Sequence, residues 1–205
     1  MFPPKEKQHP KFPSRGLCAA LIVITGLSFF VGRADANAKD PAKASTEVQW
    51  PAGYSPKTAD IYSHDEVVIH ASPATVWRWL VAAEQWPTWY PNSHNVKILT
   101  SEKVLGPHSK FAWTTFGVPQ ESTVAKYIPN ERLDYYSFHT DNSGTNDYHA
   151  WLLTPVADGC RVLSEAVHYG PNLSSYASEV NRAFRDWLNR LKAVCESHPS
   201  ASSQK

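Results

Sequence analysis

Three side chains in the second half of the chain could move protons: Tyr135, His149 and His168. An imidazole titrates near neutral pH, so a histidine enclosed by aromatic side chains can act as a general acid or base. Strand alternation places His149 on one face with Trp151 and Leu153. Tyr135 could also donate a hydrogen bond to a ligand carbonyl. The alternative is structural: hydrogen-bonded core histidines, and a core tyrosine whose hydroxyl reaches water.

The chain lacks the motifs of the common catalytic and metal centres. It contains no H-E-x-x-H, C-x-x-C, G-x-S-x-G, phosphate-binding loop or dinucleotide fingerprint. Its histidines are scattered, without the spacing of a zinc site. No pair of carboxylates falls at positions expected to face inward, and the facing of Glu165 is ambiguous. We therefore expect no metal and no cofactor.

Two cysteines lie in the part of the chain expected to fold, Cys160 at the start of the last strand and Cys195 at the end of the last helix. The strand runs out to about His168, roughly 26 Å. The helix returns from about Ser174 over roughly 32 Å. Both cysteines are therefore expected at the same end of the domain. The sequence leaves open a disulfide, which an oxidising compartment would permit, and two separate buried thiols.

The last helix is the clearest periodic element. Over residues 173–195, apolar side chains recur every three or four positions, opposite a polar side. A membrane-surface helix would look similar, but its polar face would hold more lysines. The apolar stripe consists of Leu173, Tyr176, Ala177, Val180, Phe184, Trp187, Leu188, Leu191, Val194 and Cys195.

Most of the remaining chain between residues 62 and 169 has the pattern of strands. Two short helices are expected after the first strand, the first of them at 74–83, where Ser72 can cap the helix and Pro73 fits its first turn. Short turns containing Gly, Pro, Asn or Asp favour antiparallel hairpins. Strands are expected near 62–70, 94–101, 109–116, 120–128, 132–140, 146–154 and 160–169.

Six segments within residues 62–196 resemble, in their order, the SRPBCC superfamily, the START-like helix-grip proteins of the polyketide cyclase/dehydrase type. The resemblance implies an α+β fold: a curved antiparallel sheet of six or seven strands gripping the long C-terminal helix. Apolar space enclosed in this way binds small molecules. The segments are residues 71–77 (ASPATVW), 86–91 (WPTWYP), 111–113 (FAW), 129–135 (PNERLDY), 149–155 (HAWLLTP) and 159–162 (GCRV).

Residues 1–36 have the layout of a secretory signal peptide. A basic start precedes a 16-residue apolar run over 17–32, and small residues offer cleavage after Ala36 or Ala38. The run is short for a membrane span, which needs about 20 residues; an uncleaved anchor is the alternative. We expect a periplasmic or secreted protein. Beyond the signal peptide we expect a linker at 37–61, the domain at 62–196 and a disordered tail at 197–205.

Signal removal would change the net charge from +1 to about −2. The removed residues hold five of the 20 Lys and Arg and two of the 19 Asp and Glu residues. A mildly acidic domain without a basic stripe is a poor binder of nucleic acid or anionic membranes. We therefore expect a monomer that has a small hydrophobic ligand as its partner, with no stable membrane insertion.

The function expected from these features is binding of a small hydrophobic molecule, such as a lipid, an isoprenoid or an aromatic compound. The resemblance also implies a polyketide cyclase, aromatase or dehydratase, in which Tyr135, His149 or His168 handles protons. A third possibility is an interaction or envelope-maintenance protein with a packed interior. The expected cavity walls are Phe111, Trp113, Leu133, Tyr135, Trp151, Tyr176, Ala177, Val180 and Phe184.

Overall fold

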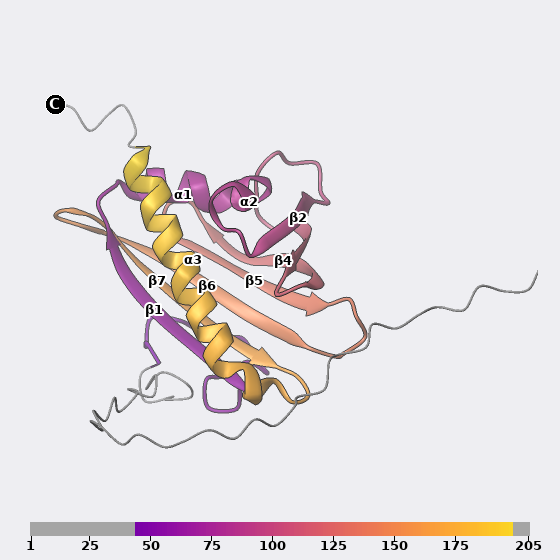
Figure 1. The fold of residues 1–205 in the computed structure, drawn as a ribbon. Helices are drawn as coiled ribbons and strands as arrows, with labels where there is room; N and C mark the ends of the chain where they lie inside the picture. Colours follow the sequence, from indigo (N-terminus) through magenta and orange to yellow (C-terminus); the bar gives the residue numbers. More distant parts are fainter. Residues whose placement is uncertain (1–43, 199–205) are drawn as a thin grey trace, which may run out of the picture. The chain divides into compact units, whose positions relative to one another are not determined.

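The structure, a computed structural model, describes residues 44–198. In this part of the chain, a seven-stranded antiparallel sheet carries a long helix, α3, across one face (Figure 1). We call this face of the sheet the inner face and the opposite one the outer face. The signal peptide predicted at 1–36 lies outside the described residues.

The strand order is β1-β7-β6-β5-β4-β3-β2, so the first two strands form the two edges of the sheet. Between them the chain forms α1 (Pro73–Val81), η2 (Ala83–Gln85) and α2 (Trp86–Trp89). The predicted α+β helix-grip fold is confirmed, and each strand lies within three residues of its predicted bounds. The strands are β1 (Ile61–Ile69), β2 (Ser93–Ile98), β3 (Lys110–Thr115), β4 (Val118–Ile128), β5 (Arg132–His139), β6 (Asn146–Val156) and β7 (Gly159–Tyr169).

The predicted last helix begins as a short 3₁₀ helix, η3 (Leu173–Tyr176), and continues as α3 (Ala177–Ser197). The buried stripe of α3 includes one polar residue, Asn181, whose Oδ1 accepts a hydrogen bond from Ser63 Oγ at 2.5 Å. The other buried members of the stripe are Ala177, Phe184, Trp187, Leu188, Leu191 and Cys195. Burial of this stripe against the inner face provides the apolar partner that the periodicity required.

Aromatic side chains fill the end of the core nearest α1. Trp86 is fully buried, and its indole nitrogen donates to the carbonyl oxygen of Leu80 at 3.1 Å. Tyr90 stacks on Trp187 of α3, with ring centroids 4.9 Å apart and planes 2° from parallel. Trp151 contacts the same Trp187 ring edge-on at 5.3 Å. Rigid rings packed in this way fill this end of the core.

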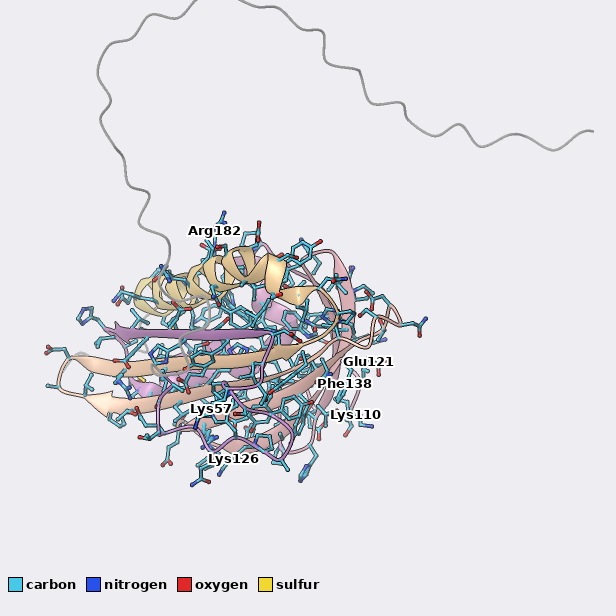
Figure 2. The ribbon with its side chains drawn as sticks, turned by 90° about the horizontal axis from the view of Figure 1, so that it is seen from below. Lys57, Lys110, Glu121, Lys126, Phe138 and Arg182 are labelled. Atoms are coloured by element: carbon cyan, nitrogen blue, oxygen red, sulfur yellow. The ribbon has the colours of Figure 1, made fainter. Side chains whose placement is uncertain are left out.

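Residues 44–60, within the segment predicted as a linker, pack across the outer face; we call them the strap. Figure 2 shows Lys57 of the strap on the side of the sheet opposite Arg182 of α3. Val48 is buried, and the rings of Trp50 and Tyr54 lie 6.0 and 5.7 Å from the ring of Tyr148. The strap therefore creates a second apolar cluster, separate from the core under α3.

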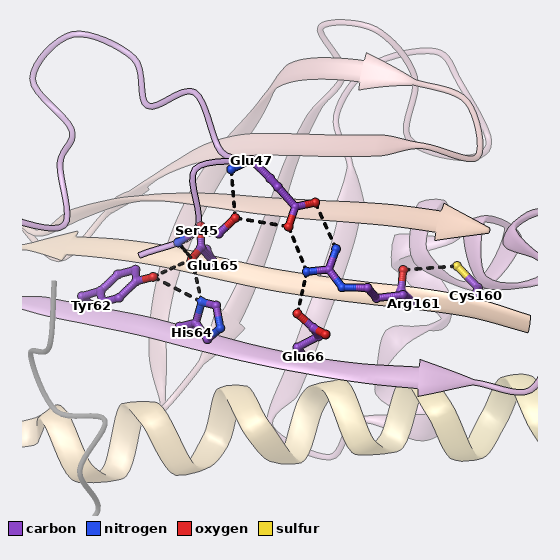
Figure 3. A network of polar contacts seen from close by, with 8 residues as sticks. All are labelled: Ser45, Glu47, Tyr62, His64, Glu66, Cys160, Arg161 and Glu165. Atoms are coloured by element: carbon purple, nitrogen blue, oxygen red, sulfur yellow. Dashed lines mark hydrogen bonds and ion pairs between the residues drawn. The ribbon is translucent and has the colours of Figure 1, made fainter. Parts of the chain in front are cut away.

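Polar contacts fasten the strap along β1 and β7 (Figure 3). Glu165 faces outward and is fully buried, which settles the facing that the sequence left ambiguous. One of its carboxylate oxygens accepts from the Tyr62 hydroxyl at 2.5 Å and from the Ser45 amide at 2.8 Å, and lies 2.6 Å from His64 Nδ1. The hydrogen bond with Glu165 raises the pKa of His64 above its usual value of 6.5, although burial opposes this.

Arg161 of β7 adds a second fastening point. Its guanidinium lies 2.9 Å from a carboxylate oxygen of Glu47 in the strap and 2.6 Å from one of Glu66 in β1. Hydrogen bonds from Arg161 hold the pKa of both carboxyl groups below the usual value. The three side chains are partly exposed, so this contact holds the strap in position but adds little to the stability of the fold.

Cys160 and Cys195 are both buried, and the structure holds them as free thiols; a disulfide between them in an oxidising compartment stays a prediction. Burial raises the pKa of Cys160 to about 11 and that of Cys195 to about 12. Both thiols are therefore protonated at neutral pH and belong to the apolar core.

Candidate functional site

A cavity of about 550 Å³ lies between the inner face and the N-terminal half of α3, at the end of the sheet farther from α1. Antiparallel neighbours bring together the ends of β3 and β5 and the starts of β1, β4 and β6, and η3 covers them. The exposed rings of Phe116 and Tyr176 lie at its rim. Tyr90 also lines the cavity, which connects the 86–91 turn to the site.

The structure brings five of the nine predicted wall residues to the cavity: Trp113, Tyr135, Tyr176, Val180 and Phe184. His149 and His168 line it as well. The other four, Phe111, Leu133, Trp151 and Ala177, are buried in the core and do not line the cavity. Leu133 and Trp151 are register partners one row closer to the aromatic end, where Trp187 covers that row. Ligand contacts of the five lining residues stay a prediction.

Tyr135, His149 and Ser164 form a hydrogen-bonded chain across β5, β6 and β7. The Tyr135 hydroxyl lies 2.8 Å from His149 Nδ1, and His149 Nε2 lies 2.8 Å from Ser164 Oγ. Burial lowers the pKa of His149 well below 6.5 and raises that of Tyr135 well above 10. The imidazole is therefore neutral at pH 7, with one ring nitrogen as a donor and the other as an acceptor. Such a pair can pass a proton or orient a ligand oxygen.

His168 lies apart from this chain. Its Nε2 is buried and has no hydrogen-bond partner, and its ring contacts that of Phe184 at 5.2 Å. Burial lowers the pKa of His168 to about 3. Neither histidine of β6 and β7 therefore supplies a positive charge to the cavity at neutral pH.

The sequence reasoning missed the carboxyl groups of the cavity. Asp147 is 7% exposed and lines the cavity. Asp141 and Glu179 line the cavity as well. Asp141 and Glu179 are exposed, so the cavity holds one buried carboxyl group, which the sequence reasoning did not single out, and not a buried pair. Asp147 precedes His149 by two residues on the same strand, so strand alternation alone would have placed it on the inner face. Burial raises the pKa of Asp147 to about 7, although a hydrogen bond from Ser137 opposes this shift.

Among residues 44–198, no group of three or more His, Cys, Asp or Glu side chains is placed to hold a metal ion. The side chains of the site that can take part in chemistry are its hydrogen-bonding and titratable groups. These are arranged on a wall that is otherwise aromatic and aliphatic.

Comparison with solved structures finds the same fold in proteins of low sequence identity. A hypothetical protein, jhp0584, from Helicobacter pylori has a TM-score of 0.68 at 22% identity, covering 74% of this chain and 98% of that one. The di-domain ARO/CYC StfQ from the steffimycin biosynthetic pathway has a TM-score of 0.56 at 15% identity, covering 66% of this chain and 50% of that one. Ara h 8.0201 has a TM-score of 0.53 at 13% identity, covering 67% of this chain and 98% of that one.

A search of curated proteins finds no match to the chain. The family described as "Polyketide cyclase / dehydrase and lipid transport" matches residues 62–196, which comprise β2 to β7 and all but one residue of both β1 and α3. The chain therefore belongs to this family, within the SRPBCC superfamily.

Proposed function

We propose that the protein binds a small, largely apolar molecule in the cavity between α3 and the inner face. The observation that carries this proposal is the cavity itself, which at about 550 Å³ has a typical ligand-site volume. Its wall combines the rings of Trp113, Tyr135 and Phe184 with a few polar and acidic side chains. The family description, which includes lipid transport, supports the same function.

The apolar wall can supply useful affinity without covalent chemistry. At about 25 cal/mol per Å², a ligand that buries roughly 300 Å² of apolar surface gains about 7 kcal/mol before the costs of association. An affinity in the low micromolar range is consistent with such a gain. We therefore expect a neutral solvatochromic dye to bind.

Val180→Trp should weaken binding of that dye by at least about tenfold, because the larger ring fills space that the ligand needs. The measurement is a fluorescence titration of wild-type and variant protein. Arg182→Trp is the matched control, since Arg182 lies on the exposed side of the same helix (Figure 2). Equal dye affinities for the wild type and Val180→Trp would contradict the proposed site.

The Tyr135–His149–Ser164 chain favours a second candidate, a cyclase or dehydratase that acts on an aromatic or polyketide-type substrate. The ARO/CYC name of the structural neighbour StfQ is consistent with it. In that case His149→Ala and Tyr135→Phe should each lose turnover by about a hundredfold while the dye still binds. Turnover that is unchanged in both variants and in His168→Ala would remove this candidate.

We also propose that the protein is exported, on the basis of the signal-peptide pattern in residues 1–36. Export would separate the protein from synthesis machinery in the cytosol, which favours binding over cyclisation. No helix within residues 44–198 combines the length and the apolar character needed to cross a membrane. The mass of the protein purified from fractions of its host tests this proposal: a chain starting at residue 37 or 39 agrees with it. An intact Met1 in the membrane fraction would indicate the uncleaved anchor, and an intact Met1 in the cytosolic fraction contradicts export.

A further inference from the structure

A row of polar side chains runs across four strands beside the cavity, and two of its members, Asp147 and His168, line the cavity. Strand register makes Ser122 of β4 the partner of Ser137 in β5, Ser137 the partner of Asp147 in β6, and Asp147 the partner of His168 in β7. We call these four residues the polar row. Gln120, one pair nearer the rim, also lines the cavity and is 3% exposed. An unbroken polar row across four strands is costly in a buried wall, which points to a ligand that uses it.

Hydrogen bonds within the protein satisfy the two serines of the polar row but not all of the polar atoms beside them. Trp113 Nε1 donates to Ser122 Oγ at 3.0 Å, and the hydroxyls of Ser122 and Ser137 share a hydrogen bond of 2.8 Å. By contrast, Gln120 Oε1 and His168 Nε2 are buried without a partner. These two groups are acceptors or can become acceptors, whereas the unpartnered Nε1 of Trp187, elsewhere on the cavity wall, is a donor. At the polar row the site therefore calls for a ligand that donates hydrogen bonds.

The charges around the cavity have one sign. Asp141, Asp147 and Glu179 line it, whereas none of the described residues that line it is a lysine or an arginine. The histidines of the cavity wall are held neutral by burial, so Asp147 has no resident cation to pair with. The faces of Trp113, Tyr135 and Phe184 add the negative potential of aromatic rings.

We propose that the polar row is the subsite for a protonated amine, so that the cavity takes an apolar molecule carrying one ammonium group in preference to one carrying a carboxylate. The ammonium would donate to the carboxylate of Asp147 and to the nearby acceptor atoms, while the apolar part lies against the aromatic wall. The raised pKa of Asp147 agrees with this assignment, because an unpaired buried carboxyl group holds its proton until a cation arrives. The inference rests on the proposed binding function and names its ligand class.

The test uses three probes on one scaffold: 2-(naphthalen-2-yl)ethanamine, the matching alcohol, and 3-(naphthalen-2-yl)propanoate. Each displaces the neutral dye from the full chain at pH 8, where Asp147 is mostly ionised and the amine is protonated. We expect the amine to bind about tenfold more tightly than the alcohol and about a hundredfold more tightly than the carboxylate. In Asp147→Asn and Asp147→Leu the amine should bind no better than the alcohol.

Asp158→Asn is the control, because Asp158 is exposed in the turn between β6 and β7. It should keep the preference for the amine. If the dye binds but the three probes bind equally, or if both Asp147 variants keep the amine preference, the inference is overturned while the binding function stands. If the dye does not bind to the wild type, the proposed function fails, and the inference fails with it.

Discussion

Asp147→Asn should make the ligand-free protein more stable, and the gain should grow as the pH rises. Burial raises the pKa of Asp147 from 3.8 to about 7. Between these values the unfolded chain has released a proton that the folded chain still holds, so the contribution of Asp147 to stability falls as pH rises through this range and is constant above it. The side chain of asparagine does not titrate, so its contribution to stability does not vary with pH in this way.

Three pKa units correspond to about 4 kcal/mol, and relaxation of the site reduces this figure. We therefore expect the gain in the free energy of unfolding to be about 1–3 kcal/mol larger at pH 8 than at pH 5, as measured by urea denaturation of both proteins. Such a result would mark Asp147 as a group kept for function at a cost in stability. A gain that is equal at both pH values, or a loss at pH 8, would contradict the buried, unpaired state of this carboxyl group.

The comparison of the two proteins isolates Asp147 because the other titratable groups around the cavity are present in both. Their protonation changes cancel to first order in the difference between the two free energies. These groups are Tyr90, Tyr135, His139, Asp141, His149, His168, Tyr176 and Glu179. Asp158→Asn, at the exposed turn, should give no pH-dependent gain.

Arg132→Met should lower the free energy of unfolding by about 3–5 kcal/mol, the largest loss that we expect from a single substitution. Asp134 is fully buried on the outer face and accepts from Arg132 Nε at 3.0 and 2.9 Å and from the Tyr148 hydroxyl at 2.6 Å. Without the guanidinium, Asp134 keeps only the hydrogen bond from Tyr148 and the charge of Lys126 on the neighbouring strand. Urea denaturation at pH 7 measures the loss.

The double variant Arg132→Met, Asp134→Leu separates loss of the ion pair from loss of packing. Replacing both charges by apolar side chains removes the unpaired carboxylate, so most of the stability should return. If the double variant is as unstable as the single one, the loss comes from packing around Arg132 and the explanation is wrong. The dye should bind to both variants, since neither residue lines the cavity.

The sequence predicted the strands well because turn residues mark their ends and side chains alternate within them. The same alternation correctly put His149 on the inner face. It could not rank positions along a strand: Leu133 and Trp151 face inward, but Trp187 of α3 covers their row. A register shift between Val124 and Lys126 also interrupts the alternation of β4. Such shifts depend on contacts between strands and leave no mark in the sequence.

The path of the strap could not be predicted, because its residues have no helical or strand period, although Trp50 and Tyr54 indicated that the segment could attach to the domain. Its aromatic side chains gain a partner surface only once β5, β6 and β7 are paired, which places Tyr136, Tyr148 and Tyr169 side by side on the outer face. The missed carboxyl group of Asp147 is a different case, since its position two residues before His149 was sufficient to place it.

The strap also sets the N-terminal limit of the packed domain. The range shared with the family begins at residue 62, but the tyrosines of the outer face and the carboxyl group of Glu165 find their cover between residues 44 and 60. A truncated chain that starts at Ile61 would expose this surface to water and to other chains. The packed unit is therefore longer at its N-terminus than the range the family shares, and cleavage after Ala36 or Ala38 would leave the strap intact.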